Sequence, residues 1–202
     1  MINFLRARKE NKMSDLINMD KIENVLRKIE RLEEDVFLPI IGRKKGAFLE
    51  SLIRKYQPKM ILEIGSLVGY SAILMARNLR KGKIISVEFV SEIANAARKH
   101  IKEAGFSDVI NVIEGNAIDT IPTLEVVFDF VFIDASKEEY FSYLKLLERY
   151  RKIVRGCVIL ADNVKIFVDS MKDYLEYVRK SEKYKSKYYD FGDDGMELSI
   201  MV

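Results

Sequence analysis

The sequence predicts an α/β fold built on a doubly wound, mostly parallel sheet of seven strands. Short runs of β-branched and aromatic residues alternate with helical patterns through most of the 202 residues, which is typical of parallel strands joined by helices on both faces of a sheet. The last two runs are separated by Gly192-Asp193-Asp194-Gly195, and Asp-Gly between β-type runs indicates a hairpin. The sheet should therefore end in an antiparallel C-terminal pair at its edge.

A helical pattern precedes the predicted sheet. From Ser14 to Val36 apolar residues recur at intervals of three and four, as in an amphipathic helix. The apolar stripe needs a partner, and the pattern leaves open whether this is the body of the domain or a second subunit. We expect an N-terminal helical extension, residues 1–38, followed by one domain, residues 39–202, which suits a chain of this length.

The order of the remaining elements follows from local periodicity and from breakers such as Gln57-Pro58 and Gly105. The predicted strands are Met60 to Ile64, Lys83 to Glu88, Val109 to Ile113, Phe128 to Asp134, Cys157 to Asp162, Lys187 to Phe191 and Met196 to Val202. The predicted helices are Gly46 to Tyr56, one that begins near Tyr70, Ser91 to Ala104, Lys137 to Tyr150 and Ser170 to Lys180.

Composition and charge exclude several classes of protein. The 34 basic side chains are nearly matched by 31 acidic ones, so the net charge alone does not indicate nucleic-acid binding. The single cysteine, Cys157, lies in an apolar run and has no internal partner, which fits a reducing environment. No apolar run approaches the roughly 20 residues of a membrane span, and no signal-peptide pattern opens the sequence. We therefore expect a cytoplasmic protein without membrane contact.

The best candidate for a ligand-binding loop follows the first predicted strand. Ligands of doubly wound sheets bind beyond the carboxyl ends of the strands, and Gly65 and Gly69 allow a tight turn and close approach of a ligand. The helix that begins near Tyr70 directs its N-terminus at the same crevice. Glu63 would repel a dinucleotide's pyrophosphate but suits a ligand with an ammonium and a sulfonium charge. Because the G-x-G-x-x-G spacing of NAD sites is also missing, this Rossmann-like unit favours S-adenosylmethionine.

Polar residues recur where the other strands end. Glu88 lies 23 residues beyond Gly65, where an acid can accept both hydroxyl hydrogens of a ribose. Asp134, Asp162 and Asn163 follow two further strands. Two carboxylates and an amide carbonyl are hard oxygen ligands, so they indicate Mg²⁺, or another divalent cation such as Ca²⁺ or Mn²⁺, rather than zinc.

Lys137 is the candidate base. It follows Asp134 by three residues at the start of a predicted helix, which directs its amine over the same strand ends. Most lysines only solubilise a surface, but a neighbouring divalent cation would favour the neutral amine and make this one a credible base. His100, the only histidine, lies on the predicted helix Ser91 to Ala104, so we interpret it as a helix residue and not as a ligand.

These residues together resemble one known family, the cation-dependent O-methyltransferases, class I enzymes that use S-adenosylmethionine and include the catechol and caffeoyl-CoA O-methyltransferases. The resemblance extends from about Pro39 to the C-terminus. It rests on Ile41-Gly42 with Lys45-Gly46, Leu62-Glu63-Ile64-Gly65 with Gly69-Tyr70-Ser71, Glu88, Gly115-Asn116-Ala117, Phe132 to Lys137 with Tyr140, Leu160 to Val164, and Asp194-Gly195.

The resemblance implies roles for individual residues. Glu63 would face the amino-acid end of S-adenosylmethionine and Ser136 would lie near its adenine. Lys137 would be the general base, with Asp134 as a second catalytic residue, and Asp134, Asp162 and Asn163 would hold Mg²⁺. The full set of residues expected at the cofactor is Ile41, Glu63, Gly65, Ser66, Gly69, Tyr70, Ser71, Glu88, Asn116, Ala117, Asp134 and Ser136.

The methyl acceptor is less well defined. A small catechol- or phenol-like hydroxyl compound is the first expectation, and we also expect a homodimer. Lys165 to Val168 leads almost directly into a helix, where relatives have a loop with Gly or Pro, so the site would be open. An open site keeps a tRNA hydroxyuridine as an alternative, with Arg43, Lys44 and Lys180 to Lys187 as candidate phosphate contacts. An NAD-type oxidoreductase and a non-catalytic binding protein are the remaining alternatives.

Overall fold

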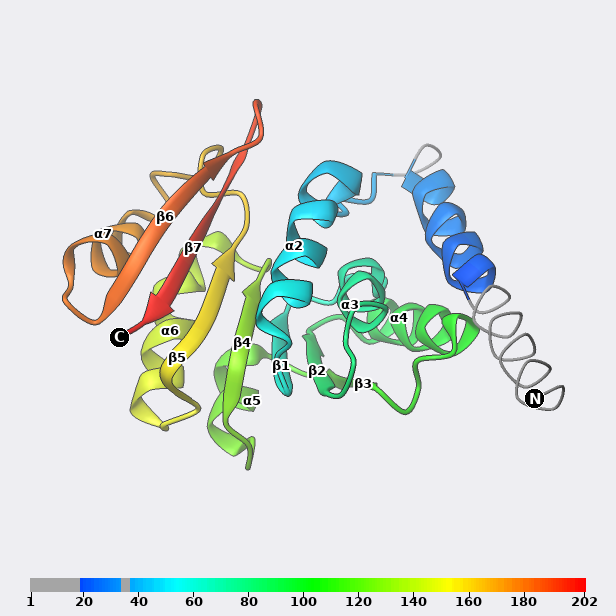
Figure 1. Ribbon diagram of the computed structural model, residues 1–202, viewed down its shortest axis with the longest axis horizontal. Coiled ribbons are helices and arrows are strands. Elements are labelled where there is room, and N and C mark those ends of the chain that lie inside the picture. The colour runs from blue at the N-terminus through cyan, green and yellow to red at the C-terminus, as the bar shows by residue number, and fades with distance from the viewer. Residues whose placement is uncertain (1–18, 34–36) are drawn as a thin grey trace, which may run out of the picture.

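The computed structural model describes residues 19–33 and 37–202 (Figure 1). These residues form one seven-stranded sheet in the order β3-β2-β1-β4-β5-β7-β6. The first five strands pair in parallel, while β7 pairs antiparallel with both β5 and β6. The strands are β1 Met60–Ile64, β2 Lys83–Glu88, β3 Ile110–Glu114, β4 Phe128–Ile133, β5 Ile153–Ala161, β6 Tyr184–Asp190 and β7 Gly195–Met201. The predicted fold class, including the closing hairpin, is confirmed.

Helices cover both faces of the sheet (Figure 1). Their bounds are α2 Gly42–Tyr56, α3 Tyr70–Ala76, α4 Ser91–Ala104, α5 Ala117–Thr123, α6 Tyr140–Arg149 and α7 Lys172–Lys180, with a 3₁₀ helix, η1, at Lys137–Glu139. Neighbouring residues of β1 show the two-sided packing, because Ile61 lies in the apolar cluster with α2, α3 and α4 while Leu62 lies in the cluster with α5, α6 and α7. This alternation follows from the two-residue period of a strand.

The helix at residues 19–33 packs against the body of the domain. Figure 1 shows it, in blue, on the α3 and α4 side of the sheet. Its buried side chains belong to the same apolar cluster as α2, α3 and α4: Val25, Leu26 and Ile29. Of the two partners that the sequence left open, the domain itself is therefore the one observed. The ends of the predicted helix, residues 14–18 and 34–36, lie outside the described residues.

Several element boundaries differ from the predictions. Helix α2 begins at Gly42 and not at Gly46, because its first turn is polar and gives no apolar period to read. The predicted helix from Lys137 to Tyr150 is divided into η1 and α6. Helix α5 was not predicted, since it has seven residues and contains Pro122. Its one sequence signal is Asn116, whose side chain caps the helix by accepting from the backbone N–H of Ile118 at 2.8 Å.

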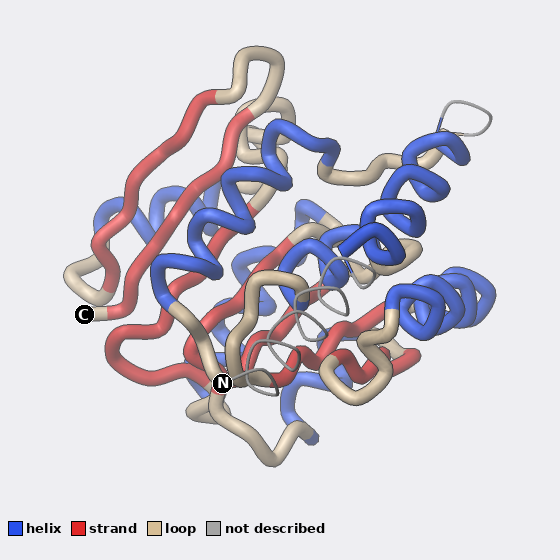
Figure 2. The backbone as a smooth tube through the Cα atoms, turned by 45° about the vertical axis from the view of Figure 1, so that its right-hand side comes forward, coloured by secondary structure: helices blue, strands red, loops and turns tan. Residues whose placement is uncertain are grey.

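The β6–β7 hairpin forms a long ribbon at one edge of the sheet (Figure 2). Strand β6 begins at Tyr184, earlier than predicted. The prediction missed this start because Lys185 and Lys187 occupy exposed strand positions and give no apolar signal. The tip of the hairpin approaches the start of α2, where the Nζ of Lys44 donates to the carbonyl oxygen of Phe191 at 2.6 Å. This contact brings the C-terminal part of the chain close to the cleft described below.

Candidate active site

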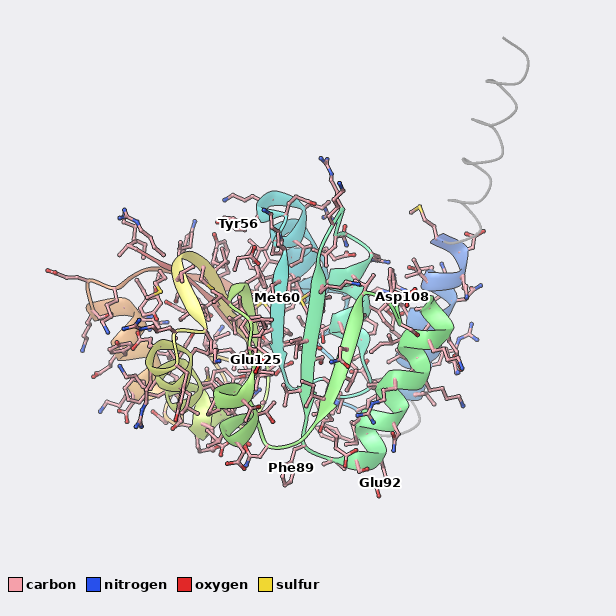
Figure 3. The ribbon with its side chains drawn as sticks, turned by 90° about the horizontal axis from the view of Figure 1, so that it is seen from below. Tyr56, Met60, Phe89, Glu92, Asp108 and Glu125 are labelled. Carbon is pink, nitrogen blue, oxygen red and sulfur yellow. The ribbon has the colours of Figure 1, made fainter. Side chains whose placement is uncertain are left out.

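A cleft of about 780 Å³ lies beyond the carboxyl ends of β1, β2, β4 and β5. Figure 3 shows the direction of the sheet, with Met60 at the start of β1 and Phe89, just beyond β2, at the opposite end. Phe89 lines the cleft, as do most of the residues predicted from the sequence: Ile41, Gly65, Ser66, Tyr70, Ser71, Glu88, Asn116, Ala117, Asp134, Ser136, Lys137, Asp162 and Asn163. Glu63 and Gly69 do not line it.

The loop after β1 brings two strands into close contact. Gly65 has φ +92°, and a Cβ atom added there would lie 2.1 Å from the carbonyl oxygen of Asp134. Only glycine fits this position, because a side chain would collide with the backbone after β4. Gly69, with φ +86°, precedes the first residue of α3 and packs against the backbone of Ala97. Gly69 therefore shapes the loop from below and is not part of the cleft surface.

Glu63 also lies beneath this loop. Its side chain is fully buried, with Ser71 Oγ donating to Oε1 at 2.5 Å and Ser86 Oγ donating to Oε2. Burial raises the pKa of Glu63 to about 8. The structure does not place Glu63 where the sequence led us to expect it, as a charge facing the ligand, because both carboxyl oxygens are taken by serine hydroxyls.

Two other groups at this loop are suited to a polar ligand. Glu88 accepts from the backbone N–H of Leu67 at 2.9 Å and from that of Val90 at 3.1 Å, which fixes its carboxylate at the cleft. The hydroxyl of Ser66 is buried and has no hydrogen-bond partner among the described residues. An unpaired buried hydroxyl costs roughly 1–3 kcal/mol. A bound ligand that pairs with Ser66 would recover this free energy.

Asp134 and Lys137 lie together in the wall of the cleft. The Nζ of Lys137 donates to Oδ1 of Asp134 at 2.8 Å and to the hydroxyl of Tyr140 at 3.0 Å. Tyr140 is fully buried, and burial raises its pKa well above the ordinary value, so its hydroxyl stays protonated. The amine is thus held between two fixed oxygens, both positioned by the turn from β4 through η1 into α6.

Asp162 lies next to this pair and is almost completely buried. Burial, and then the nearby charge of Asp134, raise the pKa of Asp162 to about 6, although Lys45 acts in the opposite direction. The Nζ of Lys45 donates to both carboxylate oxygens of Asp162 at 2.7 Å, and to Oδ2 of Asp194 at 2.9 Å. Asn163 Nδ2 donates to the same Oδ2 at 2.7 Å. The sequence predicts no role for Lys45 or Asp194, whose only signal is their place in the motifs Lys45-Gly46 and Asp194-Gly195.

The donor atoms at this end of the cleft suit a hard divalent cation. Asp134, Asp162 and Asn163 all line the cleft. The two carboxylates repel each other, and a bound cation would relieve this repulsion. Within residues 19–33 and 37–202 no three His, Cys, Asp or Glu side chains are grouped to hold a metal ion. A cation would therefore need the amide oxygen of Asn163 and would share Asp162 with Lys45.

Two other residues considered in the sequence, His100 and Arg43, do not line the cleft. His100, on α4, is buried, and its Nδ1 lies 3.0 Å from the carbonyl oxygen of Val68, as a helix residue that supports the loop. Arg43 forms ion pairs with Glu30 and Glu23. A guanidinium engaged in this way is a weaker candidate for contacting the phosphates of RNA.

Comparison with known proteins identifies the family. The family model described as O-methyltransferase matches residues 14–182. The chain belongs to the O-methyltransferase family. This membership confirms the resemblance expected from the sequence motifs.

Individual proteins similar to this O-methyltransferase family member are themselves O-methyltransferases. It is 37% identical over 174 residues to catechol O-methyltransferase B of Danio rerio, which covers 80% of this chain and 65% of that protein. The chain therefore spans slightly less than two thirds of that relative's length. A crystal structure of the O-methyltransferase from Bacillus cereus in complex with SAH (S-adenosylhomocysteine) has a TM-score of 0.80 at 26% identity, covering 89% of this chain and 91% of that one.

A second solved structure is O-methyltransferase TomG from Streptomyces achromogenes, involved in tomaymycin synthesis and solved in complex with SAM (S-adenosylmethionine). Its TM-score is 0.80 at 26% identity, with 88% of this chain and 89% of that chain covered. In the described part of our O-methyltransferase family member, no helix has the length and apolar character needed to cross a membrane.

Proposed function

We propose that this protein transfers the methyl group of S-adenosylmethionine to a hydroxyl of a small, catechol- or phenol-like acceptor, with a divalent cation assisting. The observation that supports this most strongly is that one cleft joins the glycine loop and Glu88 to the Asp134, Lys137 and Asp162 group. A cofactor and an acceptor bound in it would be neighbours. Holding two reactants in the right geometry accounts for much of the rate of a transfer reaction.

The loop side of the cleft would bind the cofactor. Glu88, fixed by two backbone N–H groups, has lone pairs left to accept the ribose hydroxyls. The unpaired hydroxyl of Ser66 would donate to the ligand. Gly65 lines the cleft, and its lack of a side chain lets the loop after β1 lie directly against the backbone at Asp134, which holds the cofactor side and the acceptor side of the cleft next to each other.

The other side would bind the acceptor. Asp134, Asp162 and Asn163 would hold the divalent cation, which when bound stabilises negative charge on the acceptor oxygen. Lys137 Nζ, held by Asp134 and Tyr140, would receive the proton of the acceptor hydroxyl. The methyl carbon is already electrophilic in the sulfonium, so the protein's task is to orient the two reactants and to move one proton.

A small acceptor agrees with the catechol O-methyltransferase named among the relatives. The aromatic ring of Phe167 lies in the cleft wall, with Lys137 Nζ 6.0 Å from the ring centre. A flat phenolic ring placed beside Phe167 would bring its hydroxyl toward Lys137.

The test combines ligand binding with activity. Titration calorimetry with S-adenosylhomocysteine and with NAD tests the cofactor, and NAD binding without S-adenosylhomocysteine binding would refute the proposal. Transfer of labelled methyl groups to a phenol and catechol panel, and to bulk tRNA that lacks the modification, tests the acceptor. Each assay is run with and without EDTA. Activity that EDTA does not change would refute the role of the cation. Methyl transfer to tRNA alone would refute a small acceptor and favour the tRNA alternative.

A further inference from the structure

Four side chains from three separate parts of the fold form one hydrogen-bonded group at the wall of the cleft. Lys45 comes from α2, Asp162 and Asn163 follow β5, and Asp194 lies in the β6–β7 hairpin turn. A single oxygen, Oδ2 of Asp194, accepts from both Lys45 Nζ and Asn163 Nδ2, at 2.9 and 2.7 Å. Asp194 is only 7% exposed. The group thus connects a distant hairpin to two residues of the proposed cation site.

The contact with Asp194 decides which way the amide of Asn163 points. A carboxylate oxygen can only accept a hydrogen bond, so the group that faces it at 2.7 Å must be the NH₂ of the amide. The carbonyl oxygen Oδ1 of Asn163 is then turned away from Asp194. The opposite orientation would set two oxygens against each other in a buried site, where repulsion is weakly screened.

Lys45 keeps Asp194 itself in place. Its ammonium donates to both oxygens of Asp162 as well as to Asp194, and these contacts are short and charge-assisted. Since Lys45 donates to the same Oδ2 atom of Asp194 that faces Asn163, that oxygen acts as an acceptor for both groups and is held in a fixed place.

We propose that Asp194 is a positioning residue that fixes the amide of Asn163 so that Oδ1 is presented to the cleft as an oxygen ligand for a divalent cation. The inference rests on the proposed cation-assisted function. It assigns to Asp194 an effect on cation affinity that is separate from cofactor binding, since Asp194 does not line the cleft. Partners that orient a ligand typically change metal affinity by about 10–100-fold.

The experiment measures the affinity for MnCl₂ by titration calorimetry of the full chain saturated with S-adenosylhomocysteine. Asp194→Ala removes the acceptor and should weaken Mn²⁺ binding at least 10-fold while S-adenosylhomocysteine affinity changes less than 2-fold. Asp194→Asn can keep a carbonyl oxygen in the place of Oδ2, so it should remain within about 3-fold of the unmodified protein. Asp193→Ala makes the same change at the exposed neighbouring residue and should have no effect.

The outcomes separate three explanations. Unchanged Mn²⁺ affinity in Asp194→Ala overturns the inference. If Asp194→Asn weakens Mn²⁺ binding as much as Asp194→Ala, the charge of Asp194 and not its placement of Asn163 is what matters, and the inference is again overturned; this arm also decides the matter if Asp194→Ala does not fold. If the unmodified protein binds no Mn²⁺, the cation-assisted part of the proposed function fails together with this inference, whereas binding of S-adenosylhomocysteine continues to test the cofactor part.

Discussion

Replacing Glu63 with glutamine should make the stability of the protein less dependent on pH. The carboxyl group of Glu63 is fully buried between the hydroxyls of Ser71 and Ser86, and glutamine has nearly the same shape. Serine hydroxyls can turn to donate or accept, so the amide keeps two partners. The Glu63→Gln protein should therefore fold and differ from the natural one mainly in having no proton to lose at this position.

The size and sign of the effect follow from the pKa. Burial raises the pKa of Glu63 from its ordinary 4.5 to about 8, so between these values the folded protein holds one more proton than the unfolded chain. The resulting stabilisation is complete below about pH 4.5 and is lost as the pH rises through 8. The full difference corresponds to about 5 kcal/mol, of which roughly half is lost between pH 6 and 9.

Urea denaturation at pH 6 and pH 9, without cofactor and with EDTA, measures this loss. From pH 6 to 9 the free energy of unfolding of the natural protein should fall by about 2–3 kcal/mol more than that of Glu63→Gln. Glu125→Gln, the same change at an exposed acid, is the matched control and should behave as the natural protein does. Equal pH dependence in the natural protein and Glu63→Gln would show that Glu63 ionises normally and would refute the reasoning.

Three further changes test the cleft. Ser66→Ala removes an unpaired buried hydroxyl, so thermal unfolding should show that the cofactor-free protein is stabilised by about 1 kcal/mol, while calorimetry should show weaker S-adenosylhomocysteine binding; a lower stability would contradict this. Gly65→Ala puts a methyl group 2.1 Å from a carbonyl oxygen and should cost about 3 kcal/mol in urea denaturation, with near-natural stability as the contrary result. Lys137→Met should lower the rate of methyl transfer by about 10²–10⁴-fold without changing S-adenosylhomocysteine affinity, and full activity would exclude Lys137 as the base.

The parts of the fold that were predictable have a strong local signal. The bounds of β1, β2 and α4 match the prediction to the residue, because both strands are short runs rich in aliphatic residues and because Gly105 ends α4 in the left-handed conformation. Helix α5 was missed since a seven-residue helix is stabilised by its cap and by packing rather than by its own periodicity.

Some residues of the candidate site were likewise predictable from the sequence, and others were not. Residues that follow strands, such as Asp134 and Asp162, could be placed together because topology brings parallel strand ends to one edge. The positions of Lys45 and Asp194 could not, since their contacts join segments 149 residues apart through a hairpin whose tip folds back over α2. Glu63 was placed at the right strand end but on the wrong side of the loop, because sequence order does not tell which face of a strand a side chain occupies.

The burial of Glu63 changes the electrostatic argument for the ligand. With a pKa of about 8, Glu63 is mostly neutral at pH 7 and does not supply the negative charge first ascribed to it. That charge comes instead from the cleft wall, where four acids outnumber two lysines among the described residues: Glu88, Asp134, Glu139 and Asp162, with Lys45 and Lys137. An excess of carboxylates favours a sulfonium cofactor and a divalent cation, and it disfavours the two phosphates of NAD. The preference for S-adenosylmethionine over NAD, first inferred from Glu63, is thus supported by the acids of the cleft wall instead.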